Sequence, residues 1–180
     1  MKRRTFLSLA TVISTLGLKG ARAQAAAPTF TFPSIDGGDH DTGAWRGRPV
    51  LVVNTASLCG FAGQLRDMQA LHEAYEARGL VVLAVPSDDF NQELETGKKV
   101  SEYCQMEYGI TLPMTDILPV AKGEVHPFFA WVRQQTGFVP RWNFSKVLLG
   151  PDGQILGTWG SFTKPGGRQI MALVAPHLSA

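Results

Sequence analysis

The 180-residue sequence predicts an α/β fold, with a mixed central sheet covered by helices on both faces. Two apolar runs, 50–53 and 80–85, have the unbroken β-branched character of strands that are buried on both sides. Between them, residues 64–78 carry apolar side chains at spacings of three and four, which is the pattern of one helical face. This succession predicts a βαβ unit with a parallel pair of strands.

The rest of the chain completes the sheet and its helices. In chain order we expect a short strand or hairpin at 29–35, a helix at 98–108, an extended segment at 114–120, a helix at 126–135, strands at 146–149 and 154–159, and a last helix at about 165–175. The turn Pro151-Asp152-Gly153 joins the last two strands into an antiparallel hairpin. A βαβ unit followed by a hairpin and a helix is typical of a thioredoxin-like fold.

The first 23 residues have the layout of a bacterial export signal. Basic residues at 2–4 precede a thirteen-residue apolar stretch, and Ala21-Arg22-Ala23 offers a small-x-small cleavage pattern. Thirteen residues are fewer than the ~20 that a helix needs to span a bilayer, which argues against a retained membrane anchor. We therefore expect a signal peptide at 1–23 and one periplasmic domain at 24–180. The adjacent arginines fit the twin-arginine route as well as ordinary export.

Removal of the signal would reverse the sign of the net charge. It takes away five of the 17 Lys and Arg residues and none of the 15 acids, so the formal charge changes from +2 to about −3. An acidic chain is not attracted to phosphate backbones or anionic lipids, and we expect neither a nucleic-acid partner nor stable membrane insertion. The remaining length suits a single domain with one core.

Cys59 is the first candidate for chemistry. It lies where the strand at 50–53 gives way to the helix at 64–78, and amides at a helix N-terminus favour the thiolate, the nucleophilic form. A buried structural cysteine is the alternative. Cys104 follows 45 positions later, so the pair also fits a structural disulfide in an oxidising compartment. The four histidines are widely spaced and none stands at ligand distance along the chain from a cysteine, so no metal site is expected.

Three neutral donors accompany this cysteine in the predicted fold. Gln92 belongs to the polar loop that leaves the strand at 80–85, and this loop should emerge at the same sheet edge as Cys59. Trp142 and Asn143 precede the predicted hairpin. Indole and carboxamide N–H groups around a sulfur would stabilise the thiolate and the departing oxygen of a peroxide. Taken singly, Trp142 fits ordinary packing and Gln92 fits a solvated loop.

The sequence resembles the glutathione peroxidase family in five collinear stretches that extend from about residue 29 to about residue 165. They are Val53-Asn54-Thr55-Ala56-Ser57-Leu58-Cys59-Gly60-Phe61, Gly79-Leu80-Val81-Val82-Leu83 with Pro86, Tyr108-Gly109-Ile110-Thr111-Leu112-Pro113-Met114, His126-Pro127, and Arg141-Trp142-Asn143-Phe144-Ser145-Lys146. The resemblance implies a thioredoxin fold that reduces hydrogen peroxide or organic hydroperoxides. It implies the catalytic residues Cys59, Gln92, Trp142 and Asn143.

The loop around Gln92 departs from the family pattern. The family carries a glycine-rich stretch before its glutamine and Glu-Pro-Gly after it, whereas this chain reads Phe90-Asn91-Gln92-Glu93-Leu94-Glu95-Thr96-Gly97. The loop is one residue shorter before Gln92, so the role of this residue depends on the register of the loop. Asp88 and Asp89 would raise the pKa of a nearby thiol if they faced it, and we expect them to face water instead.

Cys104 matches the resolving cysteine of the family members that are reduced by thioredoxin-like proteins. In that cycle Cys59 becomes a sulfenic acid, Cys104 condenses with it, and an external thiol opens the disulfide. Cys104 should start on the packed face of the helix at 98–108, so we expect this helix to unwind locally during turnover.

The expected reductant is a thioredoxin-like protein or glutathione, without a bound cofactor. The segment between Gln135 and Arg141 is short where the tetrameric, glutathione-using relatives carry an assembly loop. We therefore expect a monomer and favour a dithiol donor. In the periplasm this donor would be a thioredoxin-like protein that is supplied with electrons across the membrane.

Two other functions fit parts of the sequence. A thiol-disulfide oxidoreductase would use Cys-x-x-Cys, whereas Cys59 is followed by Gly60-Phe61-Ala62. An exported binding domain locked by a disulfide between Cys59 and Cys104 would lose stability on reduction and consume no peroxide.

Overall fold

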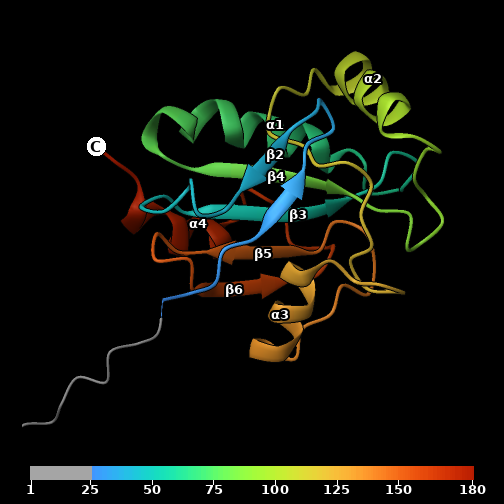
Figure 1. Ribbon diagram of the computed structural model, residues 1–180. Coiled ribbons are helices and arrows are strands. Elements are labelled where there is room, and N and C mark those ends of the chain that lie inside the picture. Colours follow the sequence, from blue (N-terminus) through green and yellow to red (C-terminus); the bar gives the residue numbers. More distant parts are fainter. Residues whose placement is uncertain (1–25) are drawn as a thin grey trace, which may run out of the picture.

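The computed structural model describes residues 26–180, so the predicted signal peptide at 1–23 lies outside the described residues. The centre of the fold is a four-stranded sheet with the strand order β4-β3-β5-β6 (Figure 1). Its strands are β3 (Val50–Thr55), β4 (Val81–Pro86), β5 (Lys146–Leu149) and β6 (Ile155–Trp159). β3 pairs parallel with β4 and antiparallel with β5, and β5 pairs antiparallel with β6. A separate antiparallel hairpin consists of β1 (Thr31–Pro33) and β2 (Asp39–Asp41).

The predicted βαβ unit is confirmed. α1 (Gln64–Tyr75) connects β3 to β4, and a short 3-10 turn extends it to Gly79, whose φ of +100° favours glycine. Every residue of β3 and β4 is buried, as their apolar sequences predict. Backbone hydrogen bonds from Ala84 to Pro113 and from Thr115 to Ala84 cover the outer edge of β4. The segment at 114–120 makes only single bridges there and forms no continuous strand.

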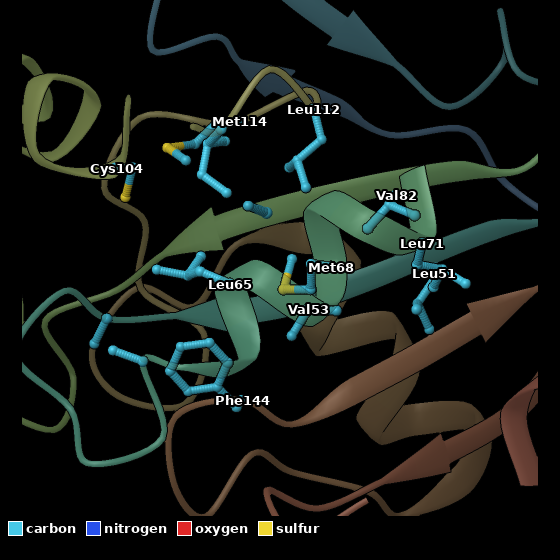
Figure 2. Close-up of a cluster of buried hydrophobic side chains, with 14 of the residues drawn as sticks. Leu51, Val53, Leu65, Met68, Leu71, Val82, Cys104, Leu112, Met114 and Phe144 are labelled. Atoms are coloured by element: carbon cyan, nitrogen blue, oxygen red, sulfur yellow. The ribbon is translucent and has the colours of Figure 1, made fainter. Parts of the chain in front are cut away.

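Helices cover both faces of the sheet (Figure 1). On one face, α1, α2 (Gly97–Tyr108) and α4 (Arg168–Val174) contribute to a core that includes Leu51 and Val53 of β3 (Figure 2). On the other face, α3 (Pro127–Thr136) packs its phenylalanines against Val52 and neighbouring strand residues. This is the thioredoxin-like arrangement that the sequence predicted. In the described part of the chain, none of the helices has the length and apolar character required to cross a membrane.

α2 is well capped but lightly packed. Its N-cap Thr96 accepts a hydrogen bond from the Lys99 amide, and Gly109 ends it in a left-handed conformation. Only Val100 and Cys104 of its twelve residues are buried. The inward position predicted for Cys104 is thus the one observed. Apart from these two residues, the helix contacts the core through the half-buried Tyr103 and Tyr108.

Candidate active site

Cys59 lies in the turns that connect β3 to α1, with 6% of its surface exposed. The amide of Phe61 donates to its Sγ at 3.4 Å. α1 begins at Gln64, so the amide that reaches the sulfur belongs to the turns before the helix. The sequence had predicted an amide at the N-terminus of the helix itself. A backbone donor still favours negative charge on this sulfur.

The structure brings Gln92 and Asn143 together beside this turn. Asn143 Nδ2 donates to Gln92 Oε1 at 3.1 Å, although 51 positions separate the two residues. The carbonyl of Gln92 accepts a hydrogen bond from the amide of Leu58, the residue before Cys59, at 2.9 Å. The shortened loop therefore presents Gln92 in a register that joins both Asn143 and the Cys59 turn.

Trp142 is fixed to the end of the strand that leads to Cys59. Its carbonyl accepts from Asn54 Nδ2 at 3.4 Å and from Ser145 Oγ at 3.0 Å, and Ser145 N donates to Asn54 Oδ1 at 2.9 Å. The indole stays 40% exposed and contacts the ring of Phe90, with 5.4 Å between the ring centroids. Hence the indole lies at the surface of the sheet edge where β3 ends and the Gln92 loop begins.

A buried lysine, Lys146, is connected to Asn143 through a chain of hydrogen bonds. Lys146 Nζ donates to Gln64 Oε1 at 2.6 Å and to the carbonyl of Ser161 at 3.3 Å. The hydroxyl of Ser161 donates in turn to the carbonyl of Asn143 at 2.6 Å. Burial lowers the pKa of Lys146 to about 8, and Asp67 opposes this shift. This network ties the start of α1 to the segment that carries Trp142 and Asn143.

Cys104 is a free, buried thiol in the same core cluster as Cys59 (Figure 2). Only 3% of the surface of Cys104 is exposed, and the residue is one of those that line a cavity of about 350 Å³. Burial raises the pKa of the Cys104 thiol to about 12, and the negative charge of Glu93 adds to this effect. The two cysteines are not joined by a disulfide, so the structure represents the reduced protein.

Glu93 is a site residue that the sequence analysis missed. Its Oε1 accepts from the amide of Ser57 at 3.0 Å and from that of Leu94 at 2.8 Å. Burial raises the pKa of its carboxyl group above the ordinary value. An acid in a polar loop normally indicates solvent exposure. The available signal was its position directly after Gln92, where the family carries the glutamate of Glu-Pro-Gly.

Asp88 is exposed, as expected for the aspartates of this loop, whereas Asp89 is half-buried. Asp89 Oδ2 accepts hydrogen bonds from the amides of Val120, Ala121 and Lys122, at 2.7, 2.6 and 3.1 Å. Asp88 Oδ1 accepts from the amide of Glu93 at 3.2 Å. Both carboxylates therefore organise the loop, and neither hydrogen-bonds to Cys59.

An apolar cleft of about 440 Å³ adjoins Trp142. Phe138, Val139 and Phe162 are among the residues that line it. Phe162 is 90% exposed, and its ring packs edge-on against that of Phe61, close to Cys59. Phe162 therefore connects this apolar cleft to the turn that carries Cys59. Among residues 26–180, no group of three or more His, Cys, Asp or Glu side chains is placed to hold a metal ion.

Comparison with known proteins identifies the family of this chain. A sequence model described as glutathione peroxidase matches residues 29–133. A glutathione peroxidase of Lactococcus lactis is 32% identical over 142 residues, which cover 76% of this chain and 90% of that protein. A hydroperoxy fatty acid reductase of Synechocystis is 31% identical over 147 residues, which cover 76% of this chain and 87% of that protein.

Solved structures agree with this result. The crystal structure of Trgpx in apo form superposes with a TM-score of 0.64 at 27% identity, over 82% of this chain and 92% of that one. A thiol:disulfide interchange protein of the thioredoxin family from Chlorobium tepidum superposes with a TM-score of 0.59 over 83% of this chain and 94% of that one. Its 16% identity shows the fold alone. Since the family match covers more than half of the sequence and the relatives align over most of their length, the chain belongs to the glutathione peroxidase family.

Proposed function

We propose that this peroxidase reduces hydroperoxides through a sulfenic acid on Cys59, which Cys104 resolves and an external thiol recycles. The observation that carries the proposal is the hydrogen bond between Gln92 and Asn143 beside the Cys59 turn. It joins two carboxamides from distant parts of the chain, and the backbone of one of them is bonded to the residue before Cys59. Trp142 adds an indole donor at the same sheet edge.

The first half-reaction needs a thiolate and donors for the departing oxygen. Cys59 Sγ attacks the terminal peroxide oxygen, the O–O bond breaks, and the alkoxide or hydroxide takes up a proton to leave as an alcohol or water. The N–H groups of Trp142, Asn143 and Gln92 are the donors that would stabilise the negative charge on this oxygen. The product on the enzyme is a sulfenic acid.

The second half-reaction consumes two thiols. Cys104 Sγ attacks the sulfur of the Cys59 sulfenic acid, and water leaves as the disulfide forms. An external dithiol then opens this disulfide by thiol–disulfide exchange, so no prosthetic group takes part. α2 must open locally for Cys104 to reach Cys59, which agrees with its light packing.

The cleft beside Trp142 favours organic hydroperoxides in addition to hydrogen peroxide. Its exposed phenylalanine and the neighbouring apolar side chains would bind the hydrocarbon part of such a substrate. The relative named hydroperoxy fatty acid reductase supports this assignment.

Location and partners complete the proposal. The predicted signal peptide directs the enzyme to the periplasm, where a thioredoxin-like protein is the favoured donor and glutathione the alternative. α3 ends at Thr136 and β5 begins at Lys146, so the intervening segment is short and favours a monomer.

The other two functions find less support. A thiol-disulfide oxidoreductase would need a second cysteine close to Cys59, and position 62 is Ala62. A domain locked by a disulfide between Cys59 and Cys104 would have no need for the hydrogen bond that brings Gln92 and Asn143 together beside the Cys59 turn.

A steady-state assay tests the proposed cycle. Peroxide-dependent oxidation of a reduced dithiol protein is followed with wild type, Cys59→Ser and Cys104→Ser. The proposal requires Cys59→Ser to be inactive and Cys104→Ser to stop after one turnover or to depend on small thiols. If Cys104→Ser turns over at the wild-type rate with the dithiol protein, Cys104 has no resolving role.

A further inference from the structure

Three buried side-chain oxygens of the site lack a hydrogen-bond partner, Asn143 Oδ1, Ser57 Oγ and Glu93 Oε2. The last two lie on residues joined by a hydrogen bond from the Ser57 amide to Glu93 Oε1. Buried polar atoms are nearly always paired, so an unpaired group requires a functional or structural reason. Neither oxygen is used in the first half-reaction described above. Both belong to groups that influence the Cys104 thiol.

The carboxylate of Glu93 is held in one orientation. Its Oε1 accepts from the amides of Ser57 and Leu94, which leaves Oε2 as the atom that is free to accept a proton. The charged or titratable groups that act on this carboxylate or on its neighbour are Asp88 from its own loop, Cys104 from α2, and Tyr108 of α2, which interacts with Cys104.

Ser57 binds the carboxylate through its amide, and its hydroxyl acts on the thiol. Ser57 is 3% exposed. Its hydroxyl lowers the pKa of the Glu93 carboxyl and that of the Cys104 thiol, because it can donate to either anion. Neither contact has the geometry of a complete hydrogen bond in the reduced protein. Contacts of this kind often tighten only when the reacting groups are engaged.

We propose that Ser57 and Glu93 form a proton relay for Cys104, a role that rests on the resolving function proposed for this cysteine. As Cys104 Sγ attacks the Cys59 sulfenic sulfur, its proton passes to Ser57 Oγ while the Ser57 hydroxyl proton passes to Glu93 Oε2. The S–S bond forms as the S–O bond breaks. The proton held by Glu93 returns through Ser57 to the departing hydroxide, which leaves as water and restores the carboxylate.

The relay answers a difficulty of the second half-reaction. While α2 is closed, burial raises the pKa of the Cys104 thiol to about 12 and keeps it protonated, yet the thiolate is the attacking form, so the thiol needs a proton acceptor as the helix opens. Ser57 lies two residues before Cys59, and Glu93 is bonded to the Ser57 amide. The acceptor therefore stays beside the sulfenic acid when α2 opens.

The test separates the two half-reactions in single-turnover experiments. Glu93→Gln keeps an oxygen for the Ser57 and Leu94 amides but accepts no proton. We expect it to slow disulfide formation by roughly 100-fold and to leave Cys59 oxidation within about twofold of wild type. Glu95→Gln is the matched control, because Glu95 is exposed on the same loop and its surface ion pair with Lys99 contributes little. It should change neither step by more than about twofold.

A pH profile distinguishes proton transfer from a structural role. In wild type, disulfide formation should accelerate as Glu93 ionises above the ordinary carboxyl pKa of 4.5 and then change little up to about pH 8. In Glu93→Gln the increase that accompanies ionisation of Glu93 should be lost. The rate of disulfide formation should then rise with hydroxide concentration over the whole pH range. Ser57→Ala removes the relay hydroxyl but keeps the amide that binds Glu93, so it provides a second test if Glu93→Gln unfolds.

Several outcomes would overturn the relay. Disulfide formation at the wild-type rate in both variants refutes it, and so does equal slowing of both half-reactions. Faster disulfide formation in Glu93→Gln would show that the carboxylate only keeps Cys104 protonated. If wild type itself forms no disulfide between Cys59 and Cys104 after peroxide, the relay fails together with the resolving role, a result that is distinct from failure of the relay alone.

Discussion

Replacing Thr96 with alanine should speed the reactions of Cys104, because Thr96 caps the helix that buries it. Thr96 Oγ1 accepts from the Lys99 amide at 3.3 Å at the start of α2. Loss of such a cap destabilises a helix by about 1 kcal/mol. If that free energy is lost from the closed state, the fraction of molecules with α2 open rises about fivefold.

The structure indicates that this opening is local. Only Val100 and Cys104 of α2 are buried, and exposing a valine costs about 1.5–3 kcal/mol. Unfolding the whole domain costs about 5–15 kcal/mol, so α2 should open far more often than the domain unfolds. Hydrogen exchange should therefore find the α2 amides less protected than those of β3 and β4.

Two assays measure the effect of Thr96→Ala. Alkylation of Cys104 in a Cys59→Ser background should accelerate about fivefold, and disulfide formation after a peroxide pulse should accelerate by up to the same factor. Thr136→Ala is the control, because it removes a side-chain hydrogen bond to the carbonyl of Val132 in α3, away from Cys104. Unchanged alkylation in Thr96→Ala, or α2 amides as protected as β3 in wild type, would refute the reasoning.

Three further predictions concern other parts of the site. Burial lowers the pKa of Lys146 to about 8. The contribution of this lysine to the free energy of unfolding should therefore rise by up to about 3 kcal/mol between pH 8 and 10.5. Denaturant titrations of wild type and Lys146→Met measure this rise. Gln92→Ala leaves the buried Nδ2 of Asn143 without its acceptor, so the free energy of unfolding should fall by about 1–3 kcal/mol in denaturant titrations. Stopped-flow measurements should show a slower oxidation of Cys59. Phe162→Ala removes apolar surface from the cleft, so kcat/KM for cumene hydroperoxide should fall about fivefold. This factor corresponds to the loss of ~40 Å² of apolar contact. The value of kcat/KM for hydrogen peroxide should stay constant.

The sign of the Lys146 prediction follows from proton binding. Between pH 8 and 10.5 the unfolded chain holds a proton on this amine that the folded chain has lost, so a rise in pH favours the folded state. Cys104 acts in the opposite direction above pH 9, because its pKa is raised to about 12 in the folded protein. Only the difference between wild type and Lys146→Met isolates the lysine, and a difference that shrinks with pH would contradict the assignment.

Gln92 needs a matched control as well. Gln92→Glu keeps an acceptor for Asn143 Nδ2 but places a negative charge near the sulfur. It should preserve more of the stability than Gln92→Ala and still slow the oxidation of Cys59. Equal oxidation rates in all three proteins would exclude Gln92 from the first half-reaction.

The fold was predictable because its signals are local. The runs that became β3 and β4 are apolar on both faces, the α1 stripe repeats at three and four, and Gly79 marks its end. The segment at 114–120 was harder to assign, because its role is to cover the edge of β4 through backbone bonds that leave no side-chain pattern. The helix boundaries differ from expectation by only a few residues, where a cap decides them.

The site was predictable only in part. Cys59, Trp142 and Asn143 stand in motifs that the family resemblance singled out, but the register of Gln92 depends on contacts with Asn143 across 51 positions. The burial of Glu93 is a tertiary effect, since the residue resembles any loop acid until the Ser57 amide binds it. α1 begins at Gln64 as predicted, but the amide that reaches the Cys59 sulfur comes from the preceding turns, which carry no helical or strand pattern.

Direct trapping of the oxidised sulfur tests the central claim, that Cys59 is the atom that takes the peroxide oxygen. Reduced Cys104→Ser protein is treated with equimolar hydrogen peroxide in the presence of a 1,3-dione that traps sulfenic acids, and the adduct is located by peptide mass spectrometry. We predict one adduct per chain, on Cys59. Peroxide consumption without an adduct on Cys59, or equal consumption by Cys59→Ser, would contradict the account.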